Sequence, residues 1–95
     1  MKVTVEFLSL PLITMKLGKK KIDMEMRGAT VGDLSREIAS KIPRAVGMVV
    51  NKDGTIDDDI RVYLNGQDTI DRAGIPNLPL KDGDNVTFML LVAGG

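Results

Sequence analysis

Apolar and polar residues alternate in two stretches near the start of the chain, as they do in strands that bury one face. These stretches are Lys2–Leu8 and Lys21–Arg27, and their apolar positions are Val3, Val5, Phe7, Ile22, Met24 and Met26. We expect the two strands to pair as an antiparallel hairpin, with the methionines filling the core. The segment between them, Ser9–Gly18, is interpreted as a connection with one helical turn that ends at Gly18.

One long helix is predicted after the second strand. Thr30 and Asp33 have the spacing of a capping box, in which each side chain accepts a hydrogen bond from a free backbone N–H. The apolar residues that follow at helical spacing are Val31, Leu34, Ile38 and Ile42. Pro43 ends the helix, because a proline pushes the preceding residue towards extended conformations.

The segment Arg44–Ile60 carries the weakest pattern in the chain. Val46–Val50 is apolar and suggests a short strand, and Asn51–Gly54 has the composition of a turn. Beyond this segment, Ile60–Leu64 is a clear strand followed by Asn65-Gly66, a strong hairpin signal. We expect a brief returning strand that includes Thr69 and Ile70, and irregular chain where Gly74, Pro76 and Pro79 follow.

The last strand is predicted over Asn85–Leu91, after a turn at Lys81–Asp84. Its residues Val86, Phe88 and Leu90 face one way, and Met89 and Leu91 face the other. A sheet with one buried face should be polar on the other, so the apolar Met89 and Leu91 predict a partner-binding surface or a covered face. A strand with two apolar faces also suits a central position in the sheet, beside the first strand.

The order of predicted elements is a hairpin, a helix, and then three further strands. This order is typical of the α+β class with a β-grasp (ubiquitin-like) fold, a mixed sheet of about four to five strands with one main helix. We expect residues 1–91 to form this domain and residues 92–95 to form a flexible tail.

Charge and composition exclude several classes of function. The 95 residues contain 13 basic and 13 acidic residues, so no overall positive charge favours nucleic acid as a partner. The runs Lys19–Lys21 and Asp57–Asp59 are expected in solvated segments, and Asp53–Asp59 lacks the ligand spacing of a calcium loop. No metal site is therefore predicted.

The chain has no histidine and no cysteine, which removes disulfides, thiolate nucleophiles and the usual base at neutral pH. We therefore do not expect an enzyme that acts alone. No apolar run approaches the ~20 residues that a membrane-spanning helix needs, and Met1–Leu10 does not read as a signal peptide. The sequence predicts a cytoplasmic protein with no membrane partner.

The last four residues, Val92-Ala93-Gly94-Gly95, follow directly on the last strand. Glycine adds nothing to a core, but it lets the backbone pass close to other atoms. A slim tail with a terminal acyl carbon can enter a narrow site on another protein and react there. Fraying of the chain end is the alternative.

The hairpin signal Asn65-Gly66, the segment Leu80–Val86 and the ending Val92–Gly95 resemble the ubiquitin-like sulfur carriers. The most similar members are the small subunits of molybdopterin synthase, with the thiamine-pathway carriers as relatives. One departure is Met89-Leu90-Leu91, where many members have Phe-Pro-Pro. The resemblance covers nearly the whole domain.

This resemblance implies that an activating enzyme uses ATP to adenylate the carboxylate of Gly95, and that a sulfur-donor protein then leaves a thiocarboxylate there. It also implies that the large subunit of molybdopterin synthase takes up the tail. The chain itself would bind no cofactor. By the same resemblance, Gly94 allows close approach in a channel. The other predicted partner-binding residues are Ala93 and Val92 of the tail, and Leu91 and Met89 on the apolar outer face of the last strand.

Two other functions stay open. Archaeal ubiquitin-like modifiers share the fold and the ending, and they attach through the terminal glycine, here Gly95, to lysine amines. A β-grasp interaction module with an inert tail is the third possibility, because one fold hosts many functions.

Overall fold

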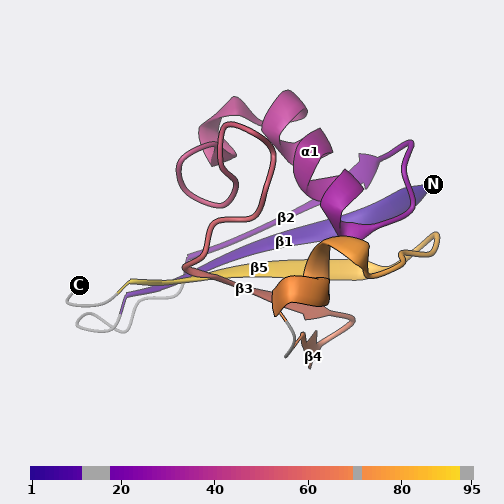
Figure 1. Ribbon diagram of the computed structural model, residues 1–95. Helices are drawn as coiled ribbons and strands as arrows, with labels where there is room; N and C mark the ends of the chain where they lie inside the picture. The colour runs from indigo at the N-terminus through magenta and orange to yellow at the C-terminus, as the bar shows by residue number, and fades with distance from the viewer. Residues whose placement is uncertain (12–17, 70–71, 93–95) are drawn as a thin grey trace.

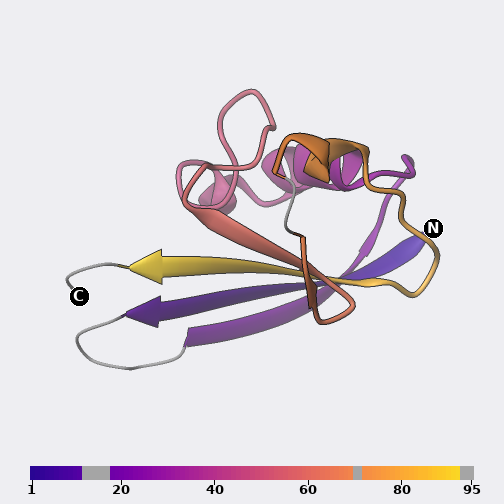
Figure 2. The same ribbon diagram turned by 60° about the horizontal axis from the view of Figure 1, so that its bottom comes forward.

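The computed structural model describes residues 1–11, 18–69 and 72–92, and for residues 9–11, 18–20, 72, 91 and 92 it describes the backbone alone. Within these residues, five strands form one sheet in the order β2-β1-β5-β3-β4, and helix α1 lies across one face (Figures 1 and 2). The strands are β1 Lys2–Pro11, β2 Gly18–Glu25, β3 Ile60–Leu64, β4 Gln67–Asp68 and β5 Asn85–Val92, and the helices are α1 Val31–Lys41 and the 3₁₀-helices η1 Pro43–Ala45 and η2 Arg72–Asn77. The predicted α+β fold of the β-grasp type is confirmed.

β1 and β2 form the predicted antiparallel hairpin, with Lys2 opposite Glu25 and Ser9 opposite Gly18. The inward-facing residues Val3, Val5, Met24 and Met26 are buried, and Phe7 and Ile22 are partly buried. The alternation of apolar and polar residues was therefore a correct guide to which face of each strand is buried.

The strands of this hairpin are longer than the pattern predicts. Residues 9–11 continue β1 and Gly18 begins β2, so the helical turn expected in Ser9–Gly18 is wrong for these residues. Residues 12–17 lie outside the described part of the chain. Lys19–Lys21, expected in a solvated turn, belongs to β2. Pairing with the long central β5 accounts for the extension, because ladder hydrogen bonds hold residues whose own pattern is weak.

α1 begins and ends where the sequence predicts. The Thr30 hydroxyl accepts a hydrogen bond from the Asp33 N–H at 3.1 Å, and the Asp33 carboxylate accepts one from the Thr30 N–H at 3.3 Å. The capping box is therefore present. Ile42 follows the last helical residue, and Pro43 starts η1 in a new direction.

η2 packs against the start of α1 and replaces the irregular chain expected from Gly74 to Pro79. A β-carbon on Gly32 would lie 2.8 Å from the carbonyl oxygen of Pro76, so only glycine allows this approach. The Val31 N–H donates to the Leu78 carbonyl at 2.9 Å, which attaches the end of η2 to the first turn of α1.

The strand predicted at Val46–Val50 is wrong. These residues form turns with isolated β-bridges, and Gly47 has φ +89°, a left-handed conformation that a regular strand does not use. The Gly47 N–H donates to the Val50 carbonyl at 2.8 Å and closes a tight loop. The turn predicted over residues 51–54 is confirmed.

The β3–β4 hairpin turns at Asn65, which has φ +51°. β4 covers Gln67–Asp68 and is thus earlier than predicted, because the two-residue turn returns the chain directly after Gly66. Thr69 follows β4, but its hydroxyl still donates to the Val62 carbonyl at 2.7 Å. Ile70, the other residue predicted in this strand, lies outside the described residues.

β5 is central, as predicted, with β1 parallel on one side and β3 antiparallel on the other. Its inward residues Val86 and Phe88 are buried with the apolar face of α1, residues Val31, Leu34 and Ile38. None of the helices in the described ranges has the length and apolar content to cross a membrane.

Candidate functional site

The predicted reactive tail continues β5, so the candidate site is built outward from the end of that strand. β1 pairs with β5 as far as Pro11 opposite Val92, whereas β3 pairs with it only as far as Ile60 opposite Leu90. Among the described strand pairings, Leu91 and Val92 are therefore held from one side only, by β1. A backbone edge of this kind is where a partner can add a strand.

The six predicted site residues differ in what the structure describes. Met89 is partly buried in β5, and Leu91 and Val92 belong to the same strand by their backbone. Val92 was expected in the tail, and it is the last residue of β5. Ala93, Gly94 and Gly95 lie outside the described residues, so their predicted roles stay predictions.

The outer face of the sheet, opposite α1, changes in character towards the end of β5. Further back, the Thr87 hydroxyl donates to the Glu6 carboxylate at 3.2 Å, a polar contact between β5 and β1. Two residues later, Met89 lies opposite Leu8 of β1, and both side chains are partly buried. The face is therefore apolar close to the tail, as predicted.

Arg61 of β3 borders this apolar pair on its other side, directly opposite Met89. Its guanidinium forms an ion pair with the Asp68 carboxylate at 3.3 Å, and its side chain is largely exposed. The cation is thus already paired, and it forms the edge of the outer surface near the tail.

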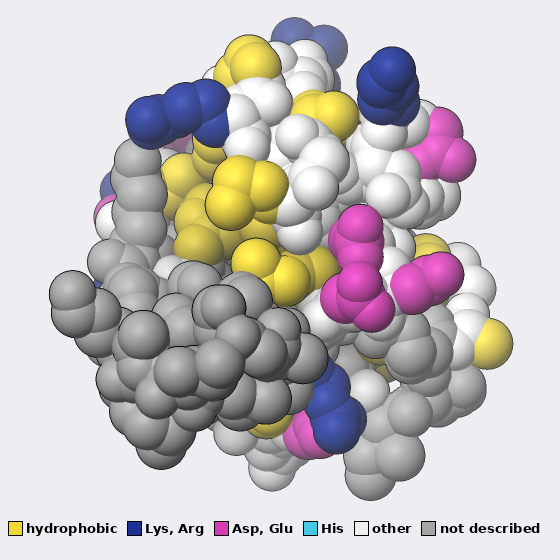
Figure 3. Space-filling model, turned by 90° about the vertical axis from the view of Figure 1, so that its left-hand side faces the viewer, with side chains coloured by type: hydrophobic (Ala, Val, Ile, Leu, Met, Phe, Trp, Pro, Cys, Tyr) yellow, Lys and Arg dark blue, Asp and Glu magenta, His cyan; other side chains and the backbone are white. Residues whose placement is uncertain are grey.

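The inner face at the same end of the sheet contains a hollow that the sequence did not predict. Phe7, Arg44, Ala45, Met48 and Val49 line it, and its volume is about 370 Å³. We call these five residues the inner-end hollow. Figure 3 views this end of the molecule and shows hydrophobic side chains gathered there, with both basic and acidic side chains at the margins.

Phe7 ties the inner-end hollow to β5. Its ring stacks on that of Phe88, with centroids 6.0 Å apart and an interplanar angle of 26°. The two residues are also opposite one another in the parallel pairing of β1 with β5. The hollow therefore lies between the hydrophobic core and the C-terminal end of β5.

The segment that supplies the other side of the hollow is attached to α1 through a buried serine. The hydroxyl oxygen of Ser35 lies 2.6 Å from the carbonyl oxygen of Gly54 and 2.8 Å from that of Gly32. A hydroxyl has one proton, so these two carbonyls share it. In the sequence, Ser35 lies next to the apolar positions of the predicted helix. A serine at such a position is the one sequence signal that could have indicated this contact.

Within the same segment, Asp53 closes the turn by accepting hydrogen bonds from the Thr55 hydroxyl at 2.6 Å and the Thr55 N–H at 3.0 Å. These bonds, the side-chain one first, hold the pKa of the Asp53 carboxyl below its usual value. Its role is to shape the turn. No group of three or more potential metal ligands occurs within the described residues.

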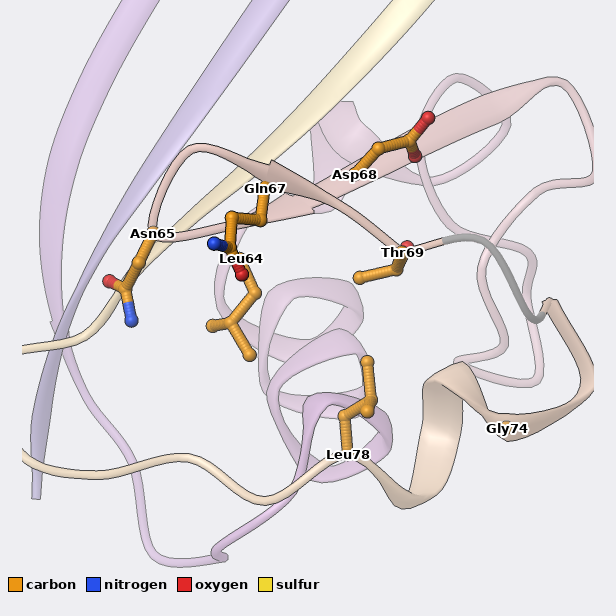
Figure 4. Close-up of a pocket in the computed structure, with 7 residues that line it drawn as sticks. All are labelled: Leu64, Asn65, Gln67, Asp68, Thr69, Gly74 and Leu78. Carbon is orange, nitrogen blue, oxygen red and sulfur yellow. The ribbon is translucent and has the colours of Figure 1, made fainter.

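A second hollow, of about 420 Å³, lies at the other end of β5 (Figure 4). Leu64 and Leu78 face one another across it, and Asp68 points away. Leu64 lies opposite Val86, near the start of β5, so this hollow is remote from the strand end that leads into the tail. Of the described residues that line it, only Asp68 is titratable, and its carboxylate is directed away from the hollow.

The geometry defines a ubiquitin-like β-grasp domain whose central strand β5 ends at Val92, and comparison with known proteins identifies the family. The ThiS family model matches residues 13–95, which is most of the chain. The chain belongs to the ThiS family and is a ubiquitin-like sulfur carrier by that membership. Membership also indicates an activating enzyme as a partner. A comparison with curated proteins gave no match.

Several solved structures share the fold. Small archaeal modifier protein 1 of Haloferax volcanii is 24% identical, with a TM-score of 0.65 over 97% of this chain and 99% of that one. The HVO 2177 protein of Haloferax volcanii is 28% identical, with a TM-score of 0.53 over 97% and 88%. Small archaeal modifier protein 1 of Methanosarcina acetivorans is 19% identical, with a TM-score of 0.55 over 97% and 98%.

Proposed function

We propose that this protein carries sulfur as a thiocarboxylate on Gly95. The observation that supports the proposal most is the ThiS family match, which runs through residue 95 and so includes the Gly94-Gly95 ending. The position of β5 agrees with it, because a central strand presents the following residues from a rigid sheet. The missing histidine and cysteine agree as well, since a carrier needs no catalytic side chain of its own.

The chemistry takes place on the Gly95 carboxylate in the site of the activating enzyme. A carboxylate oxygen attacks the α-phosphorus of ATP, an acyl-adenylate forms, and pyrophosphate leaves. A hydrosulfide equivalent from a sulfur-donor protein then attacks the acyl carbon. The C–O bond to AMP breaks, AMP leaves with that oxygen, and the thiocarboxylate remains. ATP is a substrate of the partner in this scheme, and the carrier binds no cofactor.

We assign the carrier to molybdopterin synthesis, as the small subunit of molybdopterin synthase. The resemblance of Leu80–Val86 and Val92–Gly95 to that branch of the family supports this assignment. The large subunit of molybdopterin synthase would take up the tail and pass the sulfur to the pterin precursor. The predicted contacts of Met89, Leu91 and the tail belong to this proposal.

A second function, conjugation to lysines, is favoured by the structural neighbours. Two of the solved structures are named modifier proteins, and their likeness to this chain covers nearly its whole length. Conjugation starts from the same activated Gly95, and a lysine amine takes the place of the sulfur donor. The two functions therefore differ only in the nucleophile that displaces AMP.

The experiment is mass spectrometry of protein purified from its source. A carrier shows a form whose mass is raised by the difference between sulfur and oxygen, located at Gly95. A modifier shows branched peptides, in which the tail is joined to a lysine of another protein. An unmodified Gly95 in cells that are making cofactor would contradict both functions and favour an interaction module.

Deletion of Gly95 tests the reacting residue directly. Adjacent Cα atoms lie about 3.8 Å apart, and a misplacement of ~1 Å can cost ~10²-fold in rate. We expect ATP–pyrophosphate exchange with the activating enzyme to fall by ~10²-fold or more, while the melting temperature does not change. Gly94→Ala keeps the length of the tail and serves as the milder control. Full exchange by the deletion variant would sink the assignment of Gly95.

A further inference from the structure

The inner-end hollow has the build of a docking site for one large apolar side chain. Ala45 and Val49 are buried at its base, with 7% and 8% of their surfaces exposed. Met48 stands at its edge with 56% exposed, and it is the one large hydrophobic residue classed as exposed among the described residues. A volume of about 370 Å³ is at the small end for ligand pockets, which suits a side chain better than a free metabolite.

The charge beside the hollow indicates which charge accompanies the apolar side chain that docks there. Arg44 lines the hollow and is exposed, and no described residue forms an ion pair or hydrogen bond with its guanidinium. Arg36 and Arg61 differ in this respect, because they are paired with Asp33 and Asp68. An unpaired cation next to an apolar hollow is complementary to a carboxylate that flanks an apolar side chain.

The position of the hollow indicates which partner brings that side chain. Phe7 and Phe88 are opposite one another, and β5 ends at Val92, four residues after Phe88. The hollow therefore borders the end of β5 on the inner face. A protein that binds the tail in its own active site must contact this end of the domain.

We propose that the inner-end hollow docks an acidic–apolar segment of the activating enzyme, with the apolar side chain against Met48 and Phe7 and the carboxylate on Arg44. This inference rests on the proposed function, since it names the partner that activates Gly95. Interfaces of this kind have an apolar centre and a charged rim, and a few central residues carry most of the binding free energy. The docked segment holds the domain while the tail reaches the adenylation site.

The test uses the full chain and the activating enzyme encoded in the same genome. The variants are Met48→Asp, which places a charge at the edge of the hollow, and Arg44→Glu, which reverses the unpaired cation. Lys52→Glu is the matched control, because Lys52 is exposed in the neighbouring turn and changes the net charge equally. Both assays, ATP–pyrophosphate exchange and calorimetric titration, are run with melting curves.

We expect Met48→Asp and Arg44→Glu each to weaken binding about tenfold or more, as the loss of a central contact does. The KM for the carrier should rise by the same factor, with kcat nearly unchanged. The Arg44→Glu effect should shrink as salt is added, because ions screen exposed charges. Lys52→Glu should bind like the wild type.

Wild-type binding by both variants would overturn the proposal. If Met48→Asp lowers the melting temperature strongly, Arg44→Glu alone decides, since Arg44 is a surface residue. Loss of self-association, seen by sedimentation with binding to the enzyme unchanged, would assign the hollow to a second copy of this chain and also overturn the proposal.

Failure of the docking site and failure of the proposed function give different results. If Gly95 deletion abolishes exchange while both hollow variants behave like the wild type, the carrier function stands and the docking site is wrong. If the wild type supports no exchange, the proposed function fails. Calorimetry then still decides whether the enzyme binds at the hollow.

Discussion

At the scale of single residues, Asp33 stabilises the start of α1 through several contacts at once. Its carboxylate accepts hydrogen bonds from the Ala29 N–H at 3.0 Å and from the Thr30 N–H, and it pairs with Arg36. The Ala29 hydrogen bond is the largest cause that lowers the pKa of this carboxyl, followed by the contacts with Thr30 and Arg36. The negative charge also lies at the positive end of the helix dipole.

Thr30→Ala removes the second hydrogen bond of the capping box, because the Asp33 N–H loses the Thr30 hydroxyl as its acceptor. We expect the free energy of unfolding to fall by about 0.5–2 kcal/mol, with activation of Gly95 unchanged. Chemical denaturation measures the change, and Thr30→Ser is the control, because serine keeps the hydroxyl. An unaltered unfolding midpoint in Thr30→Ala would show that the cap contributes nothing.

At the scale of elements, Asn65 joins the β3–β4 turn to the start of β5. Its amide donates to the Asp84 carboxylate at 3.1 Å, and its side-chain oxygen accepts from the Asn85 N–H at 2.8 Å. Asp84 also accepts from the Lys81 N–H at 2.8 Å, which closes the preceding turn. Two loops far apart in sequence thus position the first residues of β5.

The pKa of Asp84 is lowered, first by the hydrogen bond from the Lys81 backbone and next by that from the Asn65 side chain. A lowered pKa in the folded state means that the charged carboxylate favours folding. This stabilisation is complete above the unfolded pKa of about 3.9, and it is lost as the pH falls through the lower folded-state pKa.

Asp84→Ala should therefore reduce the free energy of unfolding by about 1–3 kcal/mol at neutral pH, because the carboxylate is buried and hydrogen-bonded. The difference from the wild type should narrow as the pH drops below about 4. Urea denaturation from acid to neutral pH measures it. Asp58→Ala, which removes an exposed carboxylate, is the control. A difference that stays constant with pH would contradict an electrostatic cause.

At the scale of the whole molecule, the end of β5 has an apolar surface on each face of the sheet. Met89 and Leu8 lie on the outer face, and the inner-end hollow lies on the other. α1, η2 and the segment after α1 cover only the inner face (Figure 2). A partner that takes up the tail can therefore contact the domain from both sides of the strand.

Met89→Asp tests the outer surface. We expect binding to the activating enzyme or to the large subunit of molybdopterin synthase to weaken about tenfold, because a charge replaces an apolar contact. The melting temperature should change little, since the side chain is only partly buried. Met89→Leu, which keeps the apolar surface, is the control. Unfolding of Met89→Asp would instead make Met89 a core residue and end this proposal.

The sequence by itself determined the elements whose signals are local. Alternation identified β1, β2 and β5 and their buried faces, and β3 was predicted as a strand. Thr30 and Pro43 bounded α1, and Asn65-Gly66 marked the hairpin. Each of these signals acts within a few residues, through side-chain periodicity, capping or backbone conformation. The resemblance of the tail likewise depends on residues that are adjacent in the chain.

The tertiary structure alone decided the features that depend on distant partners. Residues 9–11 became strand because β5 pairs with them, and Val46–Val50 became turns because Gly47 bends the chain back and Ser35 holds the next turn to α1. The inner-end hollow exists only because this segment and Phe7 of β1 lie together at the end of β5. No local pattern encodes such a meeting, since it follows from packing between segments that are far apart in the sequence.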